Sequence, residues 1–467
     1  MLYNKFAKQI HTKEVFYTSD LLYNQKNLIG RLYRYFSVYF ETFSAPTMET
    51  LFLLVLSILV LESADSIRFL YQHFISGITE KSLNTFYYAC SYAKADYSRF
   101  MNVTASMALK LIPDSLKQQP VFLCIDDTMV SKFGKKFENV SKLFDHATHN
   151  GSNYLNGHCF VSIMLCVPVW KNSKCVYLSI PLGYCMWQKE ISKLDLAASM
   201  VRRVMPNLSA IRNVILLCDS WYAKKNLVSI VHEYENLDII CNARNDSVIY
   251  DLAPPKTGKR GRPAKHGKRL SVEDDFSLSD EKIGDYFIGV RRVLSNLFGE
   301  REVLAFVTST GHTNSSKRLY FSTVFPEQIT MFCAWQEKAP LNQTGSDRMK
   351  YIPLFLYVFR WNIETSYYEQ KTFWSLCSYM VRSRKGIEML VNLINISYCA
   401  MKILPYQDVA FSEYQDKSVQ EFRFALSSQI REQVFYAHFM KNIENSIKSN
   451  QFINTLKMLI HQQGYHF

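Results

Sequence analysis

The pattern of apolar and polar positions divides the chain into three kinds of segment. From Leu32 to Leu111 apolar residues recur at helical spacing, and glycine and proline are sparse, which predicts several helices. Between Pro113 and Cys241 short apolar runs end at polar residues, as buried strands do. After Pro405 an amphipathic helical pattern returns and continues to Phe467. The pattern therefore predicts an α/β centre between a helical N-terminal region and a helical C-terminal region.

The central part contains short apolar runs that predict the strands of a sheet. They lie at 119–125, 158–166, 175–180, 213–218 and 237–241. The first three follow one another without an intervening helix, which favours an antiparallel meander. Helices predicted at Ser192–Val204 and Ala223–Tyr234 precede the last two strands. The run at 213–218 is so apolar that both faces of its strand should be covered.

An insertion with a different composition follows the last of these strands. It contains Pro254–Arg269, rich in proline, glycine and positive charge, which predicts a basic arm. Beyond the arm, β-like stretches occur at Tyr286–Val293, Glu302–Thr308 and Arg318–Val324. We therefore expect a helical N-terminal domain (1–115), a first part of the core (116–243), a β-rich insertion (244–350), a second part of the core (351–404) and a helical C-terminal region (405–467).

The charge of the chain changes the range of plausible partners. Among 467 residues, 54 are Lys or Arg and 41 are Asp or Glu, a formal net charge of +13. An excess of that size favours a polyanionic partner, nucleic acid before an anionic membrane. Aromatic residues make up 14% of the chain, and those outside the core offer faces on which bases can stack.

Cysteine usage and the N-terminal residues bear on the compartment. The 11 cysteines show no CxxC pair and no Cys/His ligand spacing, and their number is odd, so neither a zinc site nor a disulfide framework is indicated. Reduced thiols in the cytosol are the simpler account. Met1–Gln25 lacks the pattern of a secretory signal. The longest apolar run, Leu51–Leu61, is shorter than the about 20 residues that cross a bilayer, so it predicts a buried helix.

Four chemically distinct side chains share one side of a helix predicted in the second part of the core. Arg360 follows Tyr357 by three residues, Glu364 follows Arg360 by four, and Lys371 follows Glu364 by seven. At about 3.6 residues per turn, all four project to roughly the same side. A carboxylate flanked by phosphate-binding donors suits an enzyme that acts on a nucleic-acid backbone. The alternative is that these four side chains form only a solvent-exposed stripe of ion pairs with no catalytic role.

Two further acidic positions stand at the ends of predicted strands. Asp127 follows the first strand and Asp219 follows the fourth, and carboxylates at neighbouring strand ends can converge with Glu364. Such a group of oxygen ligands binds Mg²⁺, and a pair of ions can assist an in-line phosphoryl displacement. Asp126 is the alternative to Asp127, because strand alternation points the two to opposite faces. The alternative role of Asp219 is to cap the next helix.

These residues resemble those of a known family, the bacterial insertion-sequence transposases of the DDE class, in the branch marked by a Tyr, Arg, Glu, Lys signature. The four side chains of the predicted helix match that signature with the same spacing. Ile125–Thr128 is similar to the segment around the family's first catalytic Asp, and we favour Asp127 because the family's Asp precedes the Thr. Leu217–Asp219 is similar to the segment around the second. Tyr368 departs from relatives that carry a basic residue there.

The resemblance implies a fold, an activity and a set of partners. The fold would be a ribonuclease-H-like mixed sheet with a β-rich insertion. Asp127, Asp219 and Glu364 would hold two Mg²⁺ ions, with Mn²⁺ as a substitute. Hydrolysis would free a 3′-hydroxyl at each terminal inverted repeat. The reaction would then pass through a hairpin intermediate and end when the 3′-hydroxyl attacks target DNA. The active form would be a homodimer in a paired-end complex with DNA. It would act in the cytoplasm, at the nucleoid, and would not need a membrane.

Other residues are candidates for contacts with DNA. Tyr357, Arg360 and Lys371 would touch the strand near the scissile bond. Arg260 and Arg262, in an Arg-Gly-Arg-Pro segment, resemble the core of an AT-hook that enters the minor groove, or belong to a basic arm that grips phosphates. Trp335 would stack on an extruded base, or lie in the core.

Two alternative functions remain open. The first is a DNA-binding protein derived from a transposase that no longer cuts, against which the intact acidic triad argues. The second is a stand-alone metal-dependent nuclease, which would cleave ends but not join them. A membrane-associated reading of Leu51–Leu61 is the weakest alternative.

Overall fold

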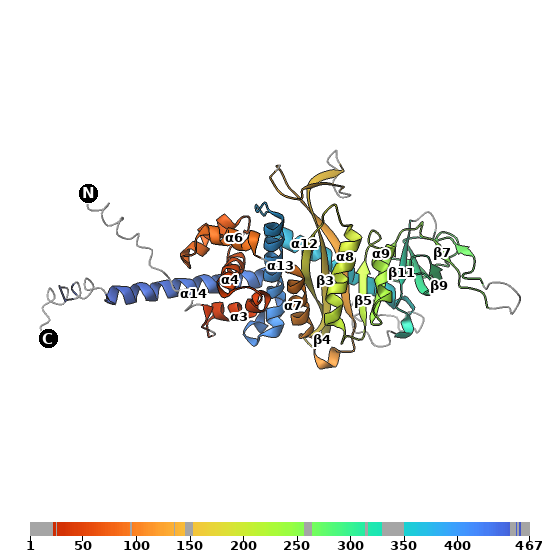
Figure 1. Cartoon of the computed structure of the whole chain (residues 1–467). Helices are drawn as coiled ribbons and strands as arrows, with labels where there is room; N and C mark the ends of the chain where they lie inside the picture. Colours follow the sequence, from red (N-terminus) through yellow and green to blue (C-terminus); the bar gives the residue numbers. More distant parts are fainter. Residues whose placement is uncertain are drawn as a thin grey trace. The chain divides into compact units, whose positions relative to one another are not determined.

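The computed structural model describes residues 22–24, 26–93, 96–134, 136–144, 153–255, 264–312, 316–328 and 350–448, together with 454, 457 and 458. The chain forms two compact units. One unit comprises 1–94, 373–381 and 417–467, and the other comprises 95–372 and 382–416. Figure 1 shows the elements of each unit.

The first unit is helical in its described part. Its α-helices are α3 (Leu28–Phe40), α4 (Ala45–Val60), α5 (Ile67–His73), α6 (Leu83–Tyr92) and α14 (Val419–Lys448). Helix α4 contains the long apolar run of the sequence and is buried from Thr50 to Val60. It packs against α3, α5, α6 and α14. The predicted buried helix is therefore confirmed.

A buried arginine of α14 stabilises the C-terminal end of α4. The Arg423 guanidinium donates to the carbonyls of Ile58 (2.8 Å) and Leu61, and to that of Phe373 (2.5 Å). Burial lowers the pKa of Arg423 to about 10. Because the last carbonyls of a helix have no partner within the helix, this cation supplies donors that α4 itself lacks.

The second unit is built on a mixed sheet of eleven strands in the described part. The strands are β1 (Val121–Ser131), β2 (Ser141–Phe144), β3 (Tyr154–Lys171), β4 (Lys174–Met186), β5 (Val214–Cys218), β6 (Leu237–Ala243), β7 (Ile249–Tyr250), β8 (Arg269–Leu270), β9 (Phe287–Ser295), β10 (Val303–Ser309) and β11 (Lys317–Ser322). Their order is β2-β3-β1-β5-β6-β11-β10-β9-β7-β8, and β4 pairs with β3.

The pairing directions fix where the strand ends meet. Strands β1 and β3 are antiparallel, as are β3 and β4, which confirms the predicted meander. Strand β5 is parallel to β1, and β6 is parallel to β5. The last paired residues of β1 and β5 are Ile125 and Cys218. The next residues, Asp126 and Asp219, therefore lie at the same edge of the sheet.

The strands of the insertion extend this sheet. Strand β11 pairs antiparallel with β6, and β10 and β9 continue the antiparallel order. These strands match the three β-like stretches predicted from the sequence, which confirms the prediction of strands there.

Helices and 3₁₀ turns cover the sheet and carry the predicted motif. They are α7 (Tyr97–Leu109), α8 (Lys193–Val204), α9 (Lys225–Val228), α11 (Ile352–Leu356), the 3₁₀ turn η7 (Tyr357–Arg360), α12 (Trp361–Phe373), α13 (Arg384–Gln407) and the 3₁₀ helix η8 (Val409–Asp416). Helices α7 and α13 pack against β4, α8 packs against β3, and η7 packs against β1 and β5 (Figure 1).

Two helices differ from their predicted extents. The helix expected at Ala223–Tyr234 is reduced to α9 and a 3₁₀ turn at Ser229–His232. Just before α9, Asp219 accepts hydrogen bonds from the backbone N–H groups of Trp221 and Tyr222, which holds these two residues in a turn. Helix α13 runs through Pro405, where a boundary was expected.

Helix α13 is also long and apolar enough to cross a membrane. Its most apolar window is 89% buried inside the protein, which is the pattern of a core helix. The only other candidate among the described residues is the pair α3 and α4, which is bent by 119°.

Candidate active site

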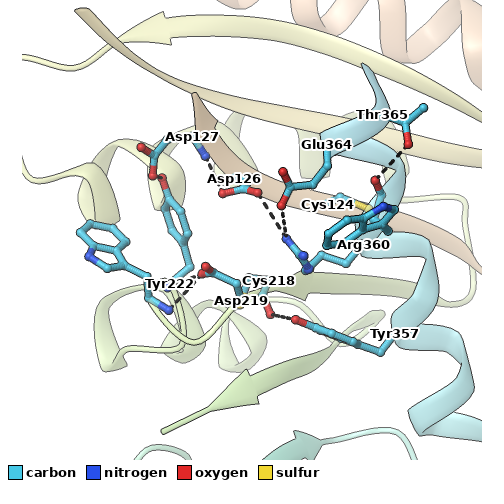
Figure 2. A network of polar contacts seen from close by, with 12 residues as sticks. Cys124, Asp126, Asp127, Cys218, Asp219, Tyr222, Tyr357, Arg360, Glu364 and Thr365 are labelled. Carbon is cyan, nitrogen blue, oxygen red and sulfur yellow. Dashed lines mark hydrogen bonds and ion pairs between the residues drawn. The ribbon is translucent and has the colours of Figure 1, made fainter. Parts of the chain in front are cut away.

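Asp126, and not Asp127, is linked through Arg360 to Glu364 of α12. The Nη1 atom of Arg360 lies 3.3 Å from Oδ2 of Asp126 and 3.2 Å from Oε1 of Glu364. Figure 2 shows the guanidinium between the two carboxylates. Arg360 is largely buried, so this is a desolvated contact of one cation with two anions.

Asp219 is the third acidic group of this site. Burial raises the pKa of Asp126 well above its ordinary value, and the nearby negative charges of Asp219 and Glu364 raise it further. One oxygen of Asp219 accepts from the backbone N–H groups of Trp221 (3.0 Å) and Tyr222 (3.1 Å). Asp219 and Glu364 are thus close enough to Asp126 to affect its ionisation. Asp219 also has the capping role that the sequence left open.

Asp127 belongs to a separate network on the opposite face of β1. Its Oδ2 lies 2.7 Å from Nζ of Lys193 and accepts from the thiol of Cys159 at 3.0 Å. Its Oδ1 accepts from the hydroxyl of Tyr222 at 2.8 Å (Figure 2). Burial lowers the pKa of Lys193, but the Asp127 carboxylate outweighs it and raises that pKa. The residue favoured from the sequence is therefore engaged away from Glu364, because successive side chains of a strand alternate.

The signature side chains approach the two strands from the segment formed by η7 and α12. The Tyr357 hydroxyl donates to the carbonyl of Cys218 at 3.2 Å, and burial raises the pKa of Tyr357. Lys371 donates to the carbonyl of Met129 at 3.1 Å. Tyr357, Arg360 and Lys371 all reach β1 or β5 or the residues that follow them, so the shared orientation predicted from the spacing is present. A 3₁₀ turn replaces the first turn of the single helix that was expected.

Two pockets open on either side of Asp219. The first has a volume of about 770 Å³ and the second of about 790 Å³. Asp219, Ser220 and Arg244 line both. The remaining lining of the first pocket includes Lys317, Arg318, Tyr357, Arg360 and Trp361, and that of the second includes Asp127, Lys142, Lys193, Trp221 and Lys224.

Several of the lining cations have no carboxylate partner among the residues that the structure describes. No carboxylate of the described residues forms an ion pair with Lys142, Lys224 or Arg318. Positive charge in a concave surface attracts phosphate groups and raises their local concentration. The acidic site is thus flanked by two basic pockets.

The donor set of the site fits a hard divalent cation in chemistry. Asp126, Asp219 and Glu364 offer only carboxylate oxygens, which Mg²⁺ prefers. Among the described residues, no three Asp, Glu, His or Cys side chains are close enough together to hold an ion as they stand. The Arg360 guanidinium instead supplies positive charge between two of them. A metal ion bound there would require this side chain to move.

Some predicted residues lie outside this site. Arg260, Arg262 and Trp335 are not among the described residues. His158, on β3, donates from Nε2 to the carbonyl of Glu138 at 2.8 Å and lies away from the three carboxylates. Tyr368 is 64% exposed.

The sequence reasoning missed Lys193, Trp221 and Tyr222. The only local indication was that an aromatic pair follows Asp219 by two residues. Lys193 gave none, because it lies far along the chain from Asp127 and only the packing of α8 on β3 brings them together.

The fold and the site together define an α/β protein with a cluster of carboxylates at the edge of a mixed sheet. The family model described as DDE superfamily endonuclease matches residues 85–286, so this part of the chain is similar to that superfamily. The match confirms the DDE class predicted from the sequence and supports a nuclease- or transposase-like function on DNA. It includes Asp126, Asp127 and Asp219 and ends before Glu364. No curated protein matches the chain.

Proposed function

We propose that this protein is a DNA transposase of the DDE class, which cuts at terminal inverted repeats and joins the freed ends to target DNA. One observation carries the proposal: Arg360 contacts both Asp126 and Glu364, and Asp219 lies beside them. Asp126 and Asp219 lie inside the segment that matches DDE endonucleases. Glu364 lies beyond that segment and completes the acidic group.

The sheet supports a ribonuclease-H-like core. Its strands β4, β3, β1, β5 and β6 are adjacent in that order. Strand β3 is antiparallel to both β4 and β1, and β5 and β6 run parallel to β1. In this arrangement the first acidic residue comes from β1 and the second follows β5. The insertion then extends the sheet before the chain returns with Glu364.

Asp126, Asp219 and Glu364 are the proposed ligands of Mg²⁺, or of Mn²⁺ as a substitute. Asp126 replaces the sequence-based choice of Asp127, because Asp126 shares Arg360 with Glu364 whereas Asp127 pairs with Lys193. When bound, the metal would polarise the scissile phosphate and assist ionisation of the attacking hydroxyl.

The residues of the signature have separate tasks in this proposal. Arg360 lines the first pocket. When its guanidinium moves away from the two carboxylates, it can therefore bind a phosphate in that pocket. Tyr357 holds the carbonyl of Cys218 and thereby positions the residue that precedes Asp219. Lys371 fixes β1 beyond Asp126 through the Met129 carbonyl.

A homodimer is part of the proposal. Helix α14 carries an exposed apolar stripe along its second half, formed by Phe435, Tyr436, Phe439, Met440 and Ile443. Earlier in the helix, apolar side chains such as Phe422, Leu426 and Ile430 are buried in the same unit. An exposed apolar stripe of this length suits contact with a second copy of the helix, which would bring two active sites to two DNA ends. The proposed place of action is the nucleoid.

A stand-alone nuclease is the second candidate, favoured by the description of the matching family as endonucleases. The two functions differ in the second reaction. A transposase joins a pre-cut 3′-hydroxyl end to a second duplex, whereas a nuclease only cleaves. Short inverted repeats bordering the gene, with a small duplication of the target outside them, would favour the transposase.

The experiment that tests the proposal compares neighbouring aspartates. Asp126→Asn should abolish Mg²⁺-dependent cleavage and strand transfer on an end-containing duplex, a loss of at least about 1,000-fold, because it removes a ligand that contributes to charge stabilisation. Binding of the duplex without metal should stay within a few-fold. Asp219→Ala should behave in the same way.

Asp127→Asn is the matched control. It should retain measurable cleavage, since it weakens the pairing with Lys193 and leaves the three proposed ligands in place. If Asp127→Asn abolishes cleavage while Asp126→Asn retains it, the assignment of Asp126 is wrong. Cleavage that persists in Asp219→Ala would remove the site altogether.

A further inference from the structure

We infer that the second pocket binds unpaired nucleotides, with a nucleobase stacked on Trp221 and phosphates held by the lysines around it. The inference rests on the proposed function and deepens it, because it assigns a ligand class and a contact residue beside the acidic site. The pocket has a volume of about 790 Å³, which is large enough for more than one nucleotide unit.

Trp221 has the position and exposure of a stacking platform. It lies two residues after Asp219, and its backbone N–H donates to Asp219 at 3.0 Å, so its main chain is held beside the carboxylates. The edge-to-face contact with Tyr222, at 4.9 Å between ring centroids, steadies the indole. The side chain is nevertheless 44% exposed. A large fixed ring that stays open to solvent offers a face to a base.

Cations surround this ring. Lys193 Nζ lies 5.1 Å from the centroid of the Trp221 ring, and Lys142 and Lys224 line the same pocket. No described carboxylate forms an ion pair with the last two, whereas Lys193 is held by Asp127. Within the described part of the chain, no carboxylate balances Lys142 or Lys224, and nucleic-acid phosphates carry the charge complementary to these lysines.

The mixture of aromatic and basic residues distinguishes this pocket from the first. Phe144 and Trp187 also line it, so it combines three aromatic side chains with its lysines. Sites for single strands use this combination, because bases stack on the rings while the backbone follows the charge. In a duplex the faces of a base are covered by its neighbours, so the ring is accessible only to a base that has left the stack. The second pocket therefore suits unpaired nucleotides beside the point of cleavage.

The test measures binding in the absence of metal, so that it does not depend on cleavage. The probe is a short single strand with one 2-aminopurine, compared with the same strand annealed to its complement, both titrated with the full chain in EDTA. Wild-type protein should bind the single strand and quench 2-aminopurine emission. Trp221→Ala should weaken single-strand binding about 5- to 150-fold, the range for loss of one base–aromatic stack, and should abolish the quenching.

Two further variants make the result specific. Trp221→Phe keeps a stacking face and should retain most of the affinity. Trp170→Ala is the matched control, because Trp170 is 43% exposed, lies on β3 and does not line either pocket. It should change neither affinity nor emission. If Trp221→Ala melts early, Trp221→Leu replaces it.

The outcomes separate the inference from the proposed function. Unchanged affinity and emission in Trp221→Ala overturn the inference, and so does an equal loss for single strand and duplex, which would mean that the pocket only grips the backbone. A protein that fails to cleave any duplex in Mg²⁺ but binds single strands through Trp221 contradicts the proposed function and leaves the base-binding site in place.

Discussion

At the scale of single residues, the central feature is a guanidinium that lies where a metal ion would be expected. Arg360 contacts Asp126 and Glu364 at 3.3 and 3.2 Å and also lines the first pocket. It lies within cation–π range of Tyr357 and Trp361, with 5.9 and 5.4 Å to the ring centroids. These rings can hold the guanidinium when it leaves the carboxylates. Arg360 and a metal ion would therefore compete for the same anions.

This competition leads to a prediction for metal binding. Arg360→Ala should bind Mn²⁺ about tenfold more tightly without DNA, because the carboxylates lose their built-in cation. The measurement is titration calorimetry of the free protein with Mn²⁺. Arg360→Lys, which keeps the charge, should stay near the wild-type affinity. Weaker or unchanged Mn²⁺ binding by Arg360→Ala would contradict the competition.

A second residue links stability to pH. Burial lowers the pKa of His158, and the positive charge of Lys132 lowers it further, whereas the bond to the Glu138 carbonyl opposes them. The unfolded chain binds its proton with a pKa of about 6.5, so it binds more protons than the folded state just below that pH. Stability should therefore fall as the pH falls through about 6.5 and down to the lowered folded value. Melting temperatures at pH 7.5 and 5.5 test this.

His158→Gln provides the comparison, since it keeps a donor for the Glu138 carbonyl and cannot titrate. The wild-type protein should lose more melting temperature between the two pH values than this variant does. Equal losses would show that His158 does not contribute to the pH dependence.

At the scale of elements, the local patterns predicted most of the strands and the antiparallel meander, but not which side chains of distant elements meet. Apolar runs ending at polar residues located β1, β3, β4, β5 and β6, because buried strands need continuous apolar sequence. The same patterns could not choose between Asp126 and Asp127. That choice depends on which face of β1 meets α12, and the two segments are far apart in the chain.

The turn after β5 shows the same limit. Its sequence is compatible with a longer helix, but the side chain of Asp219 binds the backbone of Trp221 and Tyr222 and delays the start of α9. Local competition of this kind is visible only once the side chain is placed. The residues that reasoning from the sequence missed, Lys193 and Trp221, lie next to this turn.

The apolar stripe of α14 predicts self-association at the level of one element. The double variant Phe435→Glu, Phe439→Glu should convert a dimer into a monomer, because it places charges on the face that a second copy would cover. Light scattering coupled to size exclusion gives the mass directly. Tyr92→Glu, at an exposed position of α6, is the control and should leave the mass unchanged. A variant of unchanged mass would exclude α14 from the interface.

At the scale of the whole molecule, the positive charge is divided among different parts of the chain. The net charge of +13 includes the cations of the two pockets and the basic segment around Arg260 and Arg262, which lies outside the described residues. The pockets act close to the acidic site, whereas the basic segment is remote from it in sequence. Each group of cations should release its own share of counterions when DNA binds.

This division can be measured through the salt dependence of duplex binding. Arg262→Ala should weaken binding and lower the slope of log K against log salt by about 1, the contribution of one phosphate contact, without changing the position of the cut. Lys224→Ala should lower the slope by a similar amount and also reduce cleavage, because its pocket adjoins Asp219. An unchanged slope in Arg262→Ala would mean that the basic segment does not touch DNA. Equal effects of both variants on cleavage would contradict separate roles, since only one of the two cations lines the pocket beside the carboxylates.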